Sequence, residues 1–189
     1  MALTVLDPKT ALIVVDLQKG IVGSPVREAM AGVVSRARAL IDAFRAHHLP
    51  VVLVNVAGVA PGRTEQPRPM TGAPTQGFTD FAPELGAPQP GDIVVTKRTW
   101  GAFATTDLEA RLKALGVTQV VVTGVATGTG VEATARQAYE AGFNVTLAID
   151  AMADARPEAH DYSIAKVFPR LGETGTSQQI IALLAKRSA

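Results

Sequence analysis

The sequence contains no cysteine, few aromatic residues and no long hydrophobic run. The absence of cysteine from all 189 residues excludes disulfides, thiolate metal sites and cysteine nucleophiles. We find no stretch of about 18 apolar residues and no charged-then-apolar leader, so we expect a cytoplasmic protein that does not bind membranes. The formal net charge is only +1 and charges of both signs are interspersed, which argues against nucleic acid as a partner.

Hydrophobic residues make up 47% of the chain, enough for a substantial core, and they fall into short runs separated by amphipathic segments. Buried strands that alternate with helices are typical of a doubly wound, three-layer α/β fold with a Rossmann-like parallel sheet. We interpret residues 1–189 as a single domain of this kind. The predicted strands cover residues 11–15, 51–56, 93–96, 120–123 and 144–149, with a short sixth strand near 171–174.

Capping signals predict where the helices between these strands begin and end. Small polar residues and proline favour a helix start, and glycine favours a helix end. The predicted boundaries are Ser24 with Pro25 for the first helix, capping boxes at Thr106–Glu109 and Thr176–Gln179, Pro157 for the helix after the fifth strand, and Gly142 as a left-handed cap.

The stretch from residue 118 to 142 organises the rest of the chain. A buried strand is followed by Gly-Val-Ala-Thr-Gly-Thr-Gly and then by a helical pattern from Val131. A tight turn between a strand and a helix presents free backbone N–H groups and the positive end of the helix dipole to a ligand. This turn is therefore a candidate site.

One connection is too long to be an ordinary loop. Residues 58–91 hold more than half of the twelve prolines and few apolar residues. A connection of this length in a compact domain is usually a lid, a binding loop or an arm at an interface between subunits. Because predicted strands flank it closely, we do not interpret it as a linker between domains.

Two charged residues follow predicted strands, namely Asp16 after the first and Lys97 after the third. Ligands of parallel sheets bind beyond the carboxyl ends of the strands, where the strand order reverses. Taken singly, Asp16 could be a helix cap or loop carboxylate, and Lys97 a solvated surface lysine. Together, an acid and a base at strand ends expected to lie close in space favour a functional site.

The motifs TALIVVDLQKG, VVLVNVAG, VTKRTWGAF and VVVTGVATGTGVEATARQAYEAG resemble those of the isochorismatase-like hydrolases, in order and spacing, over nearly the whole chain. The resemblance implies a six-stranded parallel sheet, oligomers, and an Asp-Lys-Cys triad in most members. Asp16 and Lys97 match the aspartate and the lysine, whereas Gly130 occupies the position of the cysteine. The resemblance also implies a cis peptide in the turn, between Val125 and Ala126.

The glycine at this position predicts the mechanism more strongly than the matches do. Without a thiolate, this chain cannot form the acyl-enzyme of the family's amidases, and Thr127 and Thr129 are poor substitutes. Isochorismatases proper also resemble this chain in having glycine here, and they cleave a vinyl ether. The resemblance then implies Asp16 as general acid, Lys97 as its partner or a carboxylate ligand, and Gly130 as space for substrate.

Further residues are candidates for binding a small-molecule substrate. They are Gln18, Arg63, Trp100, Phe103, Val125, Ala126, Thr127 and Thr129; Asn55 is also within reach of the pocket, and Arg63 could instead be a solvated lid residue. The alternative to a hydrolase is a catalytically silent binding or scaffold protein with the same fold. Retention of Asp16 and Lys97 favours the hydrolase, and loss of the cysteine suits a silent protein equally well.

Metal, cofactor and assembly complete the expectations. His47 and His48 end the first predicted helix, where cations are favourable, and His160 has no second ligand at a useful spacing, so we predict no metal site and no cofactor. The apolar-rich composition and the arm at residues 58–91, together with the family resemblance, predict a homo-oligomer, either a dimer or a tetramer.

Overall fold

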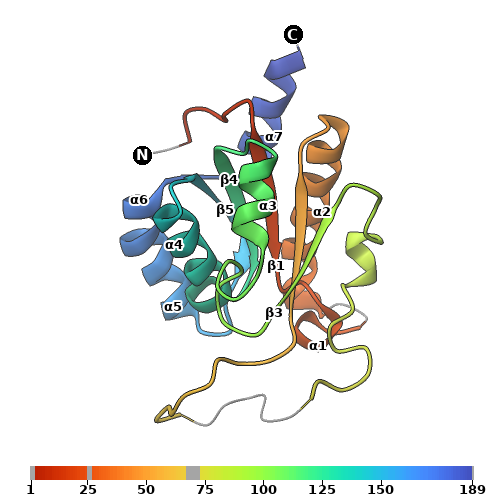
Figure 1. Ribbon diagram of the computed structural model, residues 1–189, viewed down its shortest axis with the longest axis vertical. Coiled ribbons are helices and arrows are strands. Elements are labelled where there is room, and N and C mark those ends of the chain that lie inside the picture. The colour runs from red at the N-terminus through yellow and green to blue at the C-terminus, as the bar shows by residue number, and fades with distance from the viewer. Residues whose placement is uncertain (1–2, 25–26, 67–72, 189) are drawn as a thin grey trace.

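The computed structural model describes residues 3–24, 27–66 and 73–188, and its centre is a six-stranded parallel sheet (Figure 1). The strand order is β3-β2-β1-β4-β5-β6. This arrangement confirms the predicted doubly wound α/β fold. The strands are β1 (Thr10–Val15), β2 (Val51–Val56), β3 (Ile93–Lys97), β4 (Gln119–Val125), β5 (Asn144–Ala153) and β6 (Glu173–Gly175).

The strands form because their residues are apolar on both faces, as a sheet covered by helices on each side requires. All of β1 and β4 is buried, and the two strands pair from Thr10 opposite Gln119 to Val15 opposite Gly124. The edge strand β3 instead alternates buried and exposed residues. The strand order runs outward from β1 to β3 in one direction and from β4 to β6 in the other, so it reverses between β1 and β4.

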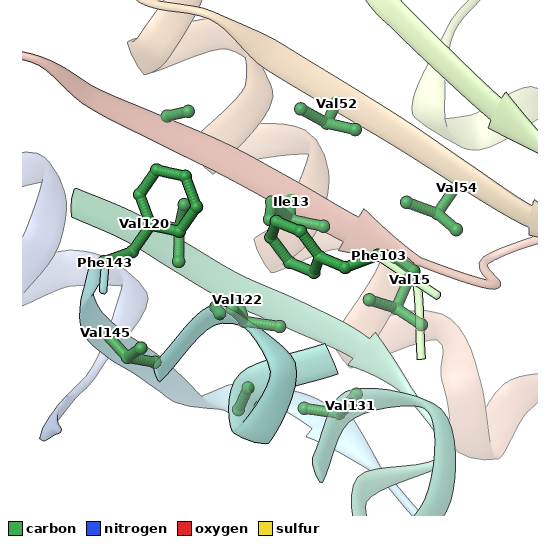
Figure 2. Packing of buried hydrophobic residues seen from close by; sticks show 14 of the residues in the cluster. Ile13, Val15, Val52, Val54, Phe103, Val120, Val122, Val131, Phe143 and Val145 are labelled. Atoms are coloured by element: carbon green, nitrogen blue, oxygen red, sulfur yellow. The ribbon is translucent and has the colours of Figure 1, made fainter. Parts of the chain in front are cut away.

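Helices cover both faces of the sheet and give two apolar cores. One core packs β-strand side chains against α3, α4 and α6, and the other packs them against α2 and α7. Figure 2 shows the first core, in which side chains from β1, β2, β4 and β5 meet Phe103 and Phe143. The helices with these roles are α2 (Glu28–Ala46), α3 (Leu108–Ala114), α4 (Glu132–Glu140), α6 (Phe168–Leu171) and α7 (Ser177–Ala185).

Shorter helical turns complete the chain. They are α1 (Lys19–Val22), α5 (Pro157–Tyr162), the 3₁₀ turns η1 (Pro83–Leu85) and η4 (Lys186–Ser188), and the π-helical turns η2 (Thr127–Val131) and η3 (Ser163–Val167). No helix in the described part of the chain combines the length and the hydrophobicity that a membrane crossing requires.

The capping predictions have mixed outcomes. The box at Thr176 and Gln179 is formed with both of its hydrogen bonds, and Gly142 has the predicted left-handed backbone with φ +87°. The box at Thr106 and Glu109 was wrong. Glu109 pairs with Lys113 one turn further along instead of reaching back to the helix start.

The start of the first long helix also differs from the prediction. Ser24 lies in a turn, and α2 begins at Glu28 with Arg27 as its N-cap. The predicted first-turn Pro25 lies outside the described residues. The sixth strand lies at Glu173–Gly175, slightly later than predicted.

The long connection after β2 extends away from the carboxyl edge of the sheet before the chain returns at residue 73 (Figure 1). On its return it packs against α1, where the ring of Phe78 lies against Gly20 so closely that a Cβ there would be 2.1 Å from it. Lys19 forms an ion pair of 3.0 Å with Asp80. The connection is therefore anchored to the segment that follows β1, at the same edge as the reversal of strand order.

Candidate active site

Asp16 and Lys97 meet at the carboxyl edge of the sheet. Asp16 directly follows β1 and has a left-handed backbone with φ +55°, a conformation that Asp and Asn adopt more readily than other non-glycine residues. Lys97 is the last residue of β3. Its ammonium nitrogen donates to Asp16 Oδ2 at 2.7 Å and to the carbonyl oxygen of Thr99 at 3.2 Å. Both side chains are almost completely buried, with 7% and 2% exposed.

This environment changes the acidity of Asp16. Burial raises the pKa of its carboxyl group from the ordinary 3.8 to about 6, while the charge and hydrogen bond of Lys97 oppose that rise. The second oxygen, Oδ1, is buried and has no hydrogen-bond partner among the described residues. A buried polar atom without a partner is costly and is common where a ligand binds. The carboxyl therefore has one oxygen fixed by Lys97 and a second, buried oxygen without a partner among the described residues.

Gly130 lies beside this pair, in the helical turn η2 that follows β4. A Cβ atom built on Gly130 would be 3.1 Å from Asp16 Oδ2, 3.0 Å from the carbonyl oxygen of Val125 and 3.2 Å from Val15. The backbone of Gly130 is not in the left-handed region, so its conformation suits other residues as well. The structure thus brings Asp16, Lys97 and Gly130 together from the ends of three strands.

The turn between β4 and α4 has the predicted cis peptide between Val125 and Ala126. Glycine is required just before it, because Gly124 has φ +117° and a Cβ there would be 2.1 Å from the carbonyl oxygen of Val15. The carbonyl of Ala126 accepts hydrogen bonds from the N–H groups of Thr129 and Val131, both at 3.1 Å. These hydrogen bonds close the turn on itself.

A cavity of about 790 Å³ lies next to this edge of the sheet. The described arm residues 59–66 form one wall, which includes Arg63, and residues of the loop after β3 and of α4 form the other. Trp100 lines the cavity with 63% of its surface exposed. Thr99, whose carbonyl holds Lys97, also lines it. Arg63 and Trp100 therefore line this cavity, whereas Asp16, Lys97 and Gly130 do not.

Another cavity, of about 560 Å³, lies at the opposite, amino-terminal edge of the sheet. Its carboxylates are occupied by protein groups, since Asp7 Oδ2 accepts from Thr118 and Asn144, and Glu173 accepts from Thr4. The carboxyl edge is the better candidate because burial raises the pKa of Asp16 there, whereas the hydrogen bonds from Thr4 lower the pKa of Glu173.

Other predicted binding residues have different surroundings from those we expected. The amide group of Gln18 is buried and bonds the backbone N–H and carbonyl of Val56 and the carbonyl of Phe78, so it anchors the connection after β2. Phe103 packs in the core against Phe143, with ring centroids 5.9 Å apart (Figure 2). Val125 is buried in the core on the opposite face of the sheet.

The threonines of the turn also differ from each other. Thr129 is half-buried, whereas Thr127 is completely buried and its hydroxyl is 2.9 Å from Nδ1 of His160. The sequence suggested only a possible role as a metal ligand for His160. No known motif links His160 to Thr127, so this contact was not predicted. Within the described residues, no three His, Asp or Glu side chains are grouped so that they could hold a metal ion.

Asn55, at the end of β2, is a further buried residue of this edge. Its amide nitrogen donates to the carbonyl of Thr79 at 3.1 Å. Its amide oxygen has no hydrogen-bond partner among the described residues. Asn55 therefore helps to hold the returning connection.

Known proteins resemble this chain over most of its length. Residues 10–179 match the isochorismatase domain. The uncharacterized isochorismatase family protein YwoC of Bacillus subtilis is 39% identical over 181 residues, which cover 92% of this chain and 93% of the relative. The ureidoacrylate amidohydrolase RutB of Stutzerimonas stutzeri is 31% identical over 79% of this chain and 72% of its own length.

A solved structure is similar over almost the whole chain. The isochorismatase family protein from Burkholderia thailandensis is 40% identical, with a TM-score of 0.88 over 96% of this chain and 98% of that one. The domain match, the similar relatives and the similar solved structure support the same conclusion. The chain belongs to the isochorismatase family of hydrolases.

Proposed function

We propose that this protein hydrolyses a small vinyl ether of the isochorismate type, with Asp16 as the general acid and without a cysteine nucleophile. The observation that supports this most strongly is the state of the Asp16 carboxyl group. Its pKa is raised to about 6, one oxygen is held by Lys97 at 2.7 Å, and the other has no partner among the described residues. A general acid works best when its pKa is near the operating pH.

The reaction needs one proton and one water molecule. Asp16 gives its proton to the terminal CH₂ carbon of the vinyl ether, which turns the ether oxygen and its carbon into an oxocarbenium ion. Water then adds to that carbon and loses a proton, which restores the Asp16 acid. The resulting hemiketal collapses to the free alcohol and a 2-oxo acid with a new methyl group, so that the net change is the addition of one water.

The absence of a side chain at Gly130 supports this reaction over amide hydrolysis. RutB is called an amidohydrolase, and a thiolate would be needed here for the acyl-enzyme chemistry of the family's amidases. This chain has no cysteine at any position. A Cβ at Gly130 would already approach Asp16 Oδ2 to 3.1 Å, so a larger residue at this position would crowd the acid.

Cationic and aromatic groups near the acid suit an unsaturated carboxylate. In this proposal Lys97 holds Asp16 and attracts the negative substrate. Arg63, in the wall of the cavity, supplies a planar guanidinium group that can bind a carboxylate with two hydrogen bonds. The exposed ring of Trp100 provides a flat apolar surface for a ring substrate. Ala126 and Thr129 are half-buried in the same turn as Gly130.

Incubation of the purified protein with isochorismate tests the function directly. We expect one pyruvate to be released for each substrate consumed, faster than in buffer alone. A protein that binds isochorismate, as seen by calorimetry, but releases no pyruvate would contradict the proposal and would support a silent binding protein of the same fold.

We also propose that the chain forms a homo-oligomer, a dimer or a tetramer. Two apolar side chains on its surface support this, Trp100 beside the arm and Val94 on the edge strand β3, which are 63% and 43% exposed. Sedimentation equilibrium at micromolar concentration should show a mass of two or four chains. A single species with the mass of one chain would contradict this expectation.

A further inference from the structure

Three side-chain hydrogen bonds connect the segment after β5 to the turn that carries Gly130 and to the start of α4. Asp154 Oδ2 accepts from the backbone N–H of Gly128 at 2.8 Å. Nδ1 of His160 lies 2.9 Å from the hydroxyl of Thr127. The hydroxyl of Ser163 donates to Glu132 Oε2 at 2.6 Å. We call residues 154–163 the brace, because they contact the turn on the side away from Asp16.

Packing between the brace and the turn is tight. A Cβ on Gly128 would be 3.1 Å from the Cβ of Ala159 and 3.4 Å from Asp154 Oδ2. Only 3% of the Asp154 side chain is exposed, and its other carboxylate oxygen accepts from the N–H of Arg156 at 3.0 Å. The hydroxyl of Thr127 is buried, whereas His160 is partly exposed. A shift of the brace would therefore be transmitted to the turn.

The turn has one side toward the brace and the other toward the acid. Thr127 and Gly128 meet His160 and Asp154, while Gly130, in the same helical turn, meets Asp16. Because η2 is a single hydrogen-bonded turn, a rotation at Thr127 also moves Gly130. We propose that His160 is a positioning residue, whose hydrogen bond to Thr127 sets the distance between Gly130 and Asp16.

A threonine nucleophile activated by His160 would need the same hydrogen bond, but the burial of Thr127 argues against it. A nucleophile has to reach its substrate, and Thr127 has no exposed surface. The hydrogen bond therefore supports positioning rather than a second reaction.

The test uses a thiol as a reporter at the site and needs no substrate. A negative result for the role of His160 can therefore be distinguished from a failure of the proposed function. The natural chain has no cysteine, hence Gly130→Cys introduces a single thiol close to Asp16 Oδ2. Its pKa is measured by titrating the ultraviolet absorbance of the thiolate, and that pKa depends on nearby charges and on the helix terminus.

In the Gly130→Cys background, His160→Ala should shift the pKa of the thiol by roughly one unit, because the distances to Asp16 and Lys97 change. His160→Asn should restore most of the parent value, since its amide places a polar atom near the position of Nδ1. Glu158→Ala, at an exposed position of the same helix α5, should leave the thiol unchanged.

Thermal unfolding of each variant separates positioning from support of the fold. A His160→Ala variant that unfolds at a lower temperature, while its thiol keeps the parent pKa, would overturn the proposal. If that variant does not fold, Thr127→Val and Thr127→Ser replace it, because valine preserves the shape without the hydroxyl and serine preserves the hydroxyl without the methyl group. We expect a shifted thiol pKa with valine and the parent value with serine. Equal values would also overturn the proposal.

Discussion

Asp16→Asn should lower the rate of vinyl ether hydrolysis by roughly 100- to 10,000-fold, the contribution of a positioned general acid. The fold should survive because asparagine is nearly isosteric and also tolerates the left-handed backbone that Asp16 adopts at φ +55°. Pyruvate release under saturating substrate measures the effect, and circular dichroism checks the fold.

The dependence on pH gives the same hypothesis a second test. A general acid must be protonated, and the pKa of Asp16 is raised to about 6. The wild-type kcat/KM should therefore fall about tenfold for each pH unit above that value, and the residual rate of Asp16→Asn should not follow this profile. Asp42→Asn, at a partly exposed ion pair on α2, is the control. A folded Asp16→Asn protein with full turnover would place the chemistry elsewhere.

Lys97→Met should destabilise the fold by about 3–5 kcal/mol at pH 8, since removing one partner leaves a buried charge uncompensated. The loss should be smaller at pH 5. Without Lys97 the two effects that lower the pKa of Asp16 are absent and burial alone acts. The pKa then rises further, so the carboxyl is neutral at pH 5 and its desolvation costs little.

The sign of the pH dependence follows from linkage. The pKa of Asp16 is higher in the folded protein than its ordinary value of 3.8, so between the two values the folded state binds more protons than the unfolded state. Stability therefore falls as the pH rises through this window, and in Lys97→Met the window extends to higher pH. Urea unfolding at several pH values measures this.

Two further variants serve as controls for Lys97→Met. Lys19→Met removes an ion pair of similar length, 3.0 Å to Asp80, but at a partly exposed site, and it should cost at most about 1 kcal/mol. Asp16→Asn combined with Lys97→Met should abolish the difference between pH 5 and pH 8. An equal loss at both pH values in Lys97→Met alone would mean that the carboxyl does not take up the proton.

The sequence was sufficient to predict the sheet and to place Asp16 and Lys97 close together at one edge, whereas the relevance of Gly130 came from the family resemblance. Runs such as ALIVV and VVVTG are too short and too apolar to be amphipathic helices, and parallel strands place their carboxyl ends at one edge. The capping box at Thr176 was also predictable, because nothing competes locally for its two side chains. At Thr106 the same pattern failed because its hydroxyl donates to the carbonyl of Ala102, while Glu109 pairs with Lys113.

Tertiary contacts explain what could not be predicted. Gln18 and Phe103 follow the candidate catalytic residues closely in sequence, yet the first bonds the backbone of β2 and the second fills the core. The pairing of His160 with Thr127 joins residues 33 positions apart. No local periodicity indicates which side chain a helix brings to a turn across the sheet.

The left-handed backbone at Asp16 also has an evolutionary consequence. Glycine and asparagine are each one nucleotide away from an aspartate codon, and both accept this conformation readily. Neither carries an acid, so either mutation would remove the proposed proton donor, and glycine would also leave the buried ammonium of Lys97 without its carboxylate partner. A chain with asparagine here could keep the fold and bind a ligand without the acid, and its sequence would still resemble that of an enzyme. The residue at position 16 of a close relative should therefore be identified before an activity is assigned to that protein.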